Sequence, residues 1–189
     1  MNKARFHILF VYAVYIVVLS VLQFAMPDVV SISGAKPDLL FVFPVLAGYM
    51  YGTMDAVVIG LVAGFIRDSY SGRFLGLSML ICLFCGIIAS VFLKKVLSRN
   101  ILLALVQVGF ATLLYTVFLT ALSLVFFNVT QPIVPYIVWV IQNQFLPNLL
   151  MNTLVAMALY FSLKKLGPYR VNKFSKTPDE NLIGDSQWE

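Results

Sequence analysis

The side chains that most often perform catalysis are few in this sequence and poorly placed for it. His7 is the one histidine, and it lies at the start of the first apolar run. Cys82 and Cys85 form a lone C-x-x-C pattern inside an apolar segment, whereas a structural zinc site takes about four ligands. This pattern favours two small packing residues over a metal or redox centre. No phosphate-binding or hydrolase motif occurs either, so we expect a non-enzymatic protein without a cofactor or metal.

The composition is that of a membrane protein. Hydrophobic residues make up 61% of the 189 residues and charged residues 11%, and the mean hydropathy is +0.94, whereas soluble domains carry about 25% charged residues. The net charge is +5 and the pI is about 9.3. Because the basic residues gather at the ends of apolar runs, the partner they indicate is anionic lipid and not nucleic acid.

Apolar runs define the expected spans. Four are long enough for a helix of about 20 residues that crosses a bilayer: 7–26, 74–93, 101–127 and 136–163. The first also resembles a signal peptide, but no A-x-A-like site follows it, so we expect an uncleaved helix. A further run, 39–66, is interrupted by Gly52, Thr53 and Asp55. Because a charge is costly at mid-bilayer, this run predicts a hairpin of two short helices, 38–51 and 54–67.

The distribution of basic residues agrees with this topology. With six spans and both termini in the cytoplasm, only Lys36, Arg67 and Arg73 lie outside. Ten basic residues then lie inside, as the positive-inside rule requires: Lys3, Arg5, Lys94, Lys95, Arg99, Lys164, Lys165, Arg170, Lys173 and Lys176. Five spans with the N-terminus outside would place nine basic residues inside and four outside. Because this split is close to ten and three, the five-span alternative stays open. We expect residues 1–166 to form the membrane domain and residues 167–189 to form a flexible cytoplasmic tail.

The second and third expected helices contain small residues at an interval of four. The series runs Gly48, Gly52, Ala56, Gly60, Gly64, Asp68, Gly72, Gly76. Helices in lipid gain little from hydrophobic burial, so small residues that allow close backbone approach mark contact faces. Two roles are open for these faces: packing the protein's own helices together, and docking the helix of a partner protein.

Asp68 is the polar member of this series, and it lies between Arg67 and Arg73. We expect its carboxylate to order the loop between the third and fourth helices by pairing with either arginine or with backbone N–H groups. Direct contact with a partner or ligand is the alternative.

Polar residues also recur at helical spacing in the last two spans. Thr112, Thr116 and Thr120 lie on one side of the fifth helix. Gln144, Asn148 and Asn152 lie on one side of the sixth, in which Pro147 predicts a kink. Amides in a bilayer seek hydrogen-bond partners, so these side chains should face protein. The sequence leaves open whether they face a helix of this chain, a second protein or a small polar substrate.

The segment 36–80 resembles the rod shape-determining protein MreD family of bacteria. The resemblance is carried by Pro37-Asp38-Leu39-Leu40, Gly64-Phe65, Asp68 and the run from Gly72 to Gly76-Leu77. The sequence departs from the family pattern at Arg67, where an apolar or small residue is expected. Length, number of spans and a basic cytoplasmic end agree with the family.

This resemblance implies an all-α membrane protein, a compact bundle of six transmembrane helices similar in fold to the substrate-binding subunits of energy-coupling-factor transporters. It also implies a scaffold in the cytoplasmic membrane that works with MreC, MreB, RodA and a class B penicillin-binding protein in cell elongation. The candidate contacts for the MreC transmembrane helix are Gly60, Gly64, Asp68, Gly72, Gly76, Asn148 and Asn152. Lys94, Lys95, Arg99, Lys164 and Lys165 are expected to contact anionic lipid. The alternative function is a vitamin-binding subunit of a transporter, with its ligand between the fifth and sixth helices.

Overall fold

The protein folds into a bundle of helices. The computed structural model describes residues 3–27, 31, 35–71, 76–94, 100–126 and 132–168. The helices are α1 (Lys3–Ala25), α2 (Leu39–Tyr51), α3 (Thr53–Ser71), α4 (Leu77–Lys94), α5 (Ile101–Phe126), α6 (Ile133–Val140) and α7 (Leu146–Leu166). A π-helical segment, η2 (Ile141–Phe145), joins α6 to α7 without a break.

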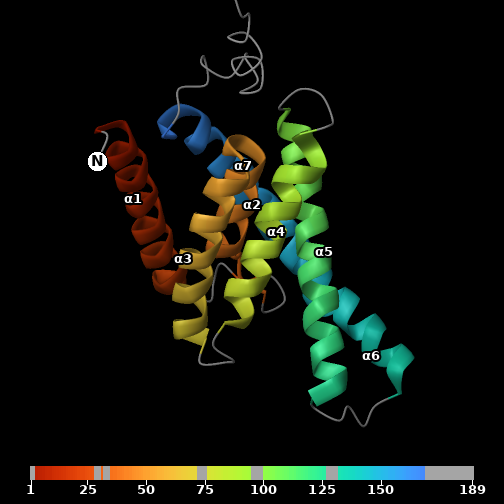
Figure 1. Cartoon of the computed structure of the whole chain (residues 1–189). Helices are drawn as coiled ribbons and strands as arrows, with labels where there is room; N and C mark the ends of the chain where they lie inside the picture. Colours follow the sequence, from red (N-terminus) through yellow and green to blue (C-terminus); the bar gives the residue numbers. More distant parts are fainter. Residues whose placement is uncertain are drawn as a thin grey trace, which may run out of the picture.

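Successive helices run in alternating directions along the bundle, with α6, η2 and α7 forming one continuous helix (Figure 1). Two hydrogen bonds fix the level of the turn between α2 and α3. The Tyr49 hydroxyl donates to the Asn100 carbonyl, just before α5, and the Tyr51 hydroxyl donates to the Leu163 carbonyl near the end of α7. The start of α1 lies at the same end of the bundle as the end of α7 (Figure 1).

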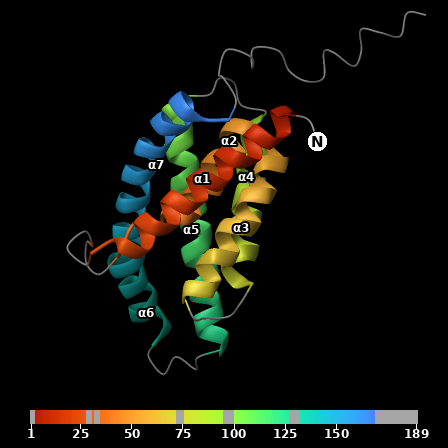
Figure 2. The same ribbon diagram turned by 90° about the vertical axis from the view of Figure 1, so that its left-hand side faces the viewer.

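Helix α2 forms the centre of the bundle. From Leu40 to Ala47 its side chains are fully buried, and it contacts α1, α3, α4, α5 and α7. A helix that is apolar all round is stable only where neighbours surround it. Helices α3 and α4 pack closely on α2 and on each other, α5 packs on α7, and α1 runs obliquely across α2 and α3 (Figure 2).

The outer faces of the bundle are apolar. Among the described residues, three stretches are long and apolar enough to cross a membrane: Phe6–Ala25, Ile101–Val125 and Val134–Leu166. Helix α2 and most of α4 (Leu77–Val91) are shorter apolar helices. Large apolar side chains such as Phe10, Val106 and Phe161 are exposed on these helices. A surface of this kind faces lipid, which identifies a helical membrane protein.

The predicted hairpin is present. Gly52 ends α2 with a φ of 115°, a backbone conformation that favours glycine, and α3 begins at the next residue. Asp55 therefore lies in the first turn of α3, as the hairpin prediction required, and not in the middle of a span. Helix α3 continues to Ser71, four residues beyond its predicted end, and α4 begins at Leu77 instead of residue 74.

The last helix contains the predicted irregularity, but as a π-helical segment. η2 ends two residues before Pro147. Proline has no N–H, and its ring crowds the carbonyl one turn earlier, so the helix there cannot keep α-helical hydrogen bonds. The Leu146 N–H instead bonds the Ile141 carbonyl, five residues back.

Candidate functional site

The centre of the bundle contains a polar cluster at the start of α2. Helix α2 has 13 residues, a length of about 20 Å, whereas a bilayer core is about 30 Å thick. Because α2 ends level with the end of α7, its first residues lie inside the bundle. Pro37 and Leu39 are buried accordingly. The first N–H groups of any helix have no acceptor within the helix. Because the start of α2 is buried, side chains of neighbouring helices must accept these hydrogen bonds.

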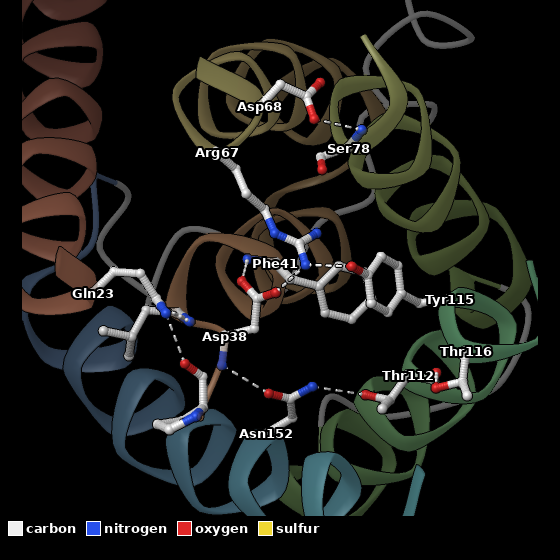
Figure 3. Close-up of polar contacts among 12 residues, drawn as sticks. Gln23, Asp38, Phe41, Arg67, Asp68, Ser78, Thr112, Tyr115, Thr116 and Asn152 are labelled. Atoms are coloured by element: carbon white, nitrogen blue, oxygen red, sulfur yellow. Dashed lines mark hydrogen bonds and ion pairs between the residues drawn. The ribbon is translucent and has the colours of Figure 1, made fainter. Parts of the chain in front are cut away.

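Side chains of α1 and α7 bind this backbone directly (Figure 3). From α1, the Gln23 amide nitrogen donates to the Pro37 carbonyl at 3.0 Å, and its oxygen accepts from the Leu39 N–H at 2.7 Å. From α7, the Asn152 oxygen accepts from the Asp38 N–H at 3.0 Å. These bonds tie the start of α2 to both helices.

The Asn152 side chain also connects α7 to α5. Its nitrogen donates to the Thr112 hydroxyl at 3.2 Å, and that hydroxyl donates to the Val108 carbonyl of its own helix at 2.8 Å. Asn152 and Thr112 are 3% and 0% exposed. Every polar atom of the Asn152 amide group is therefore satisfied within the chain, as buried polar groups require.

The Asp38 carboxylate performs two roles. One oxygen accepts from the Phe41 N–H at 3.0 Å and caps α2. The other lies 2.5 Å from Arg67 Nη2 of α3. Arg67 also donates to the Tyr115 hydroxyl of α5, and its guanidinium carbon lies 4.7 Å from the centre of that ring. The half-buried Asp38 carboxylate and the Tyr115 ring together compensate the Arg67 cation, whose side chain is 16% exposed.

We call these residues the Asp38 cluster: Gln23, Asp38, Arg67, Thr112, Tyr115 and Asn152. They come from α1, α3, α5 and α7 and from the residue that precedes α2. The cluster thus joins five parts of the chain at the point where the central helix begins (Figure 3).

The position of Arg67 corrects the sequence-based expectation. Arg67 was expected at the outer surface as a candidate partner of Asp68, but its side chain points to the bundle interior and pairs with Asp38 (Figure 3). The sequence held a signal for this pair. Charged residues inside membrane spans are rare and usually pair with the opposite charge, so an arginine within an apolar hairpin demands an acid nearby.

Asp68 instead caps the start of α4. Its oxygens accept from the N–H groups of Gly76, Ser78 and Met79 at 2.8, 2.9 and 3.1 Å. Gly76 has a φ of 96°, a backbone conformation that favours glycine. Of the two predicted ways in which Asp68 could order this loop, the structure shows the one in which the carboxylate accepts backbone N–H groups. The Asp68 side chain is 2% exposed, so both of its oxygens are occupied by contacts inside the chain and face no solvent or lipid.

Gly60 and Gly64 face α4 of the same chain. A Cβ added at Gly64 would lie 2.7 Å from the Met79 backbone nitrogen and closer still to Met79 Cα. At Gly60 it would lie 3.1 Å from the Cys82 carbonyl oxygen. Of the two roles expected for these glycines, the contacts support internal packing. A partner helix cannot dock on them while α4 covers them.

The polar series of α7 turns away from the interior along its length. Asn152 is buried, Asn148 is half-buried, and Gln144 is exposed. The expectation that all three face protein therefore holds within this chain only for Asn152 and part of Asn148. Gln144 lies in the π-helical segment η2, in which no residue is buried.

The basic candidates lie at one end of the bundle or outside the described residues. Lys164 and Lys165 are exposed in the last turn of α7, and Lys94 ends α4. Gly72, Lys95 and Arg99 lie outside the described residues, as does the tail from residue 169 onward. Contact of the basic residues with anionic lipid stays a prediction.

Cys82 and Cys85 are buried free thiols, and no three His, Cys, Asp or Glu side chains gather into a metal-binding group in the described part of the chain. The vitamin-transporter alternative placed its ligand between the fifth and sixth helices. In that region Asn152 and Thr112 hydrogen-bond to each other.

The fold and the Asp38 cluster define an all-helical membrane protein in which the polar side chains of this cluster bind the chain's own helices. A family model described as rod shape-determining protein MreD matches residues 4–169, nearly the whole chain. The chain therefore belongs to the MreD family, which implies a role in determining rod shape; this is a family of shape determinants and is not known as one of enzymes. No curated protein and no solved structure matches the chain. The likeness to transporter substrate-binding subunits stays a prediction.

Proposed function

We propose that this protein is a membrane scaffold of the cell-elongation machinery. In this proposal it binds the single transmembrane helix of MreC and helps to hold the peptidoglycan synthase, RodA with a class B penicillin-binding protein, near MreB filaments. Membership of the MreD family supports the shape-determining role. The specific partners are our inference.

One observation supports a scaffold in particular. The buried polar side chains of the Asp38 cluster bond to one another and to the backbone, and in this way they hold the bundle together. The outer faces of α1, α5 and α6–α7 are left as broad apolar surfaces. Such a molecule is built to offer a rigid, lipid-facing outline to neighbouring helices, which pack on it through van der Waals contact.

We further propose six membrane crossings in the cytoplasmic membrane, with both termini in the cytoplasm. The three long apolar stretches and the shorter α2 and α4 support this assignment, as do the alternating directions of the helices (Figure 1). Lys164 and Lys165, exposed after the last apolar turn, then lie at the cytoplasmic headgroups.

Co-purification tests the proposed partner. The affinity-tagged chain, extracted from native membranes in mild detergent, is expected to retain MreC. An unrelated tagged membrane protein at matched expression should not retain it. The same preparation is then screened with vitamins by thermal unfolding, since a specific ligand raises the melting temperature as its concentration rises. Absence of MreC together with such a ligand-dependent rise would contradict the scaffold and favour the transporter subunit.

A further inference from the structure

Three consecutive amide side chains lie in η2, and all three are exposed: Gln142, Asn143 and Gln144. Asn143 donates to the Trp139 carbonyl at 3.0 Å, whereas the other two side chains make no hydrogen bond within the described part of the chain. Because successive helical residues are turned by about 100°, the three amides point in different directions and not toward one neighbouring surface. An unpaired amide is unfavourable in hydrocarbon. This turn therefore requires a polar surrounding on several sides.

The length of the last helix places η2 at an edge of the lipid core. In the proposed topology Lys164 lies at the inner headgroups, directly after Leu163. Gln142 lies 21 residues before Leu163, a rise of about 30 Å along a helix. A bilayer core has the same thickness of about 30 Å. The apolar stretch Val134–Leu166 has 33 residues, more than the roughly 20 that one crossing needs. Its excess lies on the outer side of η2.

Helix α5 is too long in the same direction. Its 26 residues rise about 39 Å, which exceeds the core by about 9 Å. Helices α3 and α4 have 19 and 18 residues and about match the core. The end of α5 and α6 accordingly extend beyond the outer ends of α3 and α4 (Figures 1 and 2). The Tyr136 hydroxyl hydrogen-bonds the Ser123 hydroxyl at 2.8 Å and joins the two extensions.

The surface of this extension combines aromatic and apolar groups. Trp139 is 51% exposed, and Val125 and Val134 are more than 70% exposed. Tryptophan is enriched at the membrane interface, because its ring is apolar and its N–H is polar. The headgroup layer is about 5–8 Å thick on each side of the core, comparable with the extra length of α5. The extension therefore has the length and the composition of an element within that layer.

We infer that η2 marks the outer edge of the lipid core, and that α6 and residues 121–126 of α5 form an anchor in the outer phospholipid headgroup layer. The Gln142 and Gln144 amides bond headgroup and ester oxygens and the water among them, which are available in every direction around the helix. The inference rests on the proposed topology, since Lys164 sets the inner edge from which depth is counted.

The depth of spin labels in liposomes that contain only this chain and phospholipid tests the anchor. Cys82 and Cys85 are 0% and 5% exposed, so a nitroxide attaches to an introduced cysteine. At Gln142→Cys, collision with a water-soluble nickel chelate should be frequent and collision with oxygen rare. Leu150→Cys is the matched control, because Leu150 is 57% exposed on the same helix and deeper in the core, and it should show the reverse. Oxygen-rich behaviour at Gln142→Cys, or protection from both reagents by covering protein, would overturn the inference.

Labelling in spheroplasts separates depth from orientation. An impermeant maleimide added outside should react with Gln142→Cys, and with Lys165→Cys only after the membrane is opened. The opposite pattern would contradict both the proposed topology and the outer location of the anchor. The liposome measurement does not depend on orientation, so it decides separately whether η2 lies at an edge of the core.

Trp139 reports the same depth without a change in the anchor. Trp188 is the other tryptophan, so in Trp188→Phe the tryptophan fluorescence comes from Trp139 alone. Lipids brominated close to the headgroup should quench this fluorescence more than lipids brominated near the ends of the acyl chains. Stronger quenching by the deep bromines would overturn the inference.

Discussion

Arg67 of α3 and Asp38 at the start of α2 form an ion pair inside the bundle, with 2.5 Å between Nη2 and Oδ2. Asp38 also caps α2. The same carboxylate therefore accepts the Phe41 N–H at the start of the central helix and neutralises the charge of Arg67. The pair fixes the register of α3 against α2 at the end opposite to the Gly52 turn. It is therefore a structural pair whose two members depend on each other.

Removal of the arginine alone should be strongly destabilising. Arg67→Met keeps an unbranched side chain but leaves the Asp38 charge unpaired, and breaking a buried ion pair typically costs about 3–5 kcal/mol. The double variant Arg67→Met/Asp38→Asn removes both charges, while Asn still caps α2. We expect the double variant to unfold at a higher temperature than Arg67→Met in detergent. A double variant less stable than the single one would contradict the pairing.

Replacement of Asn152 should lower the thermal stability of the bundle, because its side chain bonds both Asp38 and Thr112. Asn152→Leu removes the acceptor of the Asp38 N–H and the donor to Thr112, so a buried backbone donor stays unsatisfied at a cost of about 1–3 kcal/mol. Thr120→Val is the matched control, because the Thr120 hydroxyl donates only to the Thr116 carbonyl of its own helix. Thermal unfolding of the two variants checks this. Equal losses of stability would argue against the role assigned to Asn152.

The glycines of α3 are predicted to be sensitive to a single methyl group. In Gly64→Ala the new Cβ meets the Met79 backbone, which cannot move without separating α3 from α4. In Gly109→Ala it meets only the flexible end of the Leu149 side chain at 3.3 Å, and alanine favours the helix by about 1 kcal/mol. We expect a lower melting temperature for the first variant and an unchanged or higher one for the second. The reverse order would show that α4 does not lie on Gly64.

Asp68 should act on α4 and not on a partner. Asp68→Ala removes the acceptor of three N–H groups at the start of α4, and loss of a cap costs about 0.5–2 kcal/mol. Asp68→Asn keeps one oxygen and should lose less. Hydrogen exchange at Ser78 and Met79 measures the effect, and it should accelerate most in Asp68→Ala. Exchange at these amides that does not respond to either variant would exclude the capping role.

The sequence predicted the features that depend on local chemistry. Gly52 and Asp55 located the hairpin, since a glycine and a charge within an apolar run favour a turn. Asp68 was predicted to order the following loop, because a carboxylate near a turn commonly accepts backbone N–H groups. Pro147 located the irregular segment of the last helix, because proline removes a backbone donor wherever it occurs.

The features missed by the sequence depend on which helices become neighbours. Whether Arg67 pairs with Asp38, Asp68 or neither is decided by the rotation of α3 against α2, which periodicity does not fix. The same is true of Gly64, for which the interval of four gives a contact face but not the identity of the helix that covers it.

We propose that this chain acts as a scaffold in cell elongation and that its own polar groups hold its bundle together. Depletion of the protein in its native host, followed by measurement of the length-to-width ratio of the cells, tests this claim most directly. We predict that rods become round, that the native chain restores the rods, and that Arg67→Met restores them less well than the double variant with Asp38→Asn. Cells that keep their rod shape after depletion, with no second copy of the gene present, would contradict it.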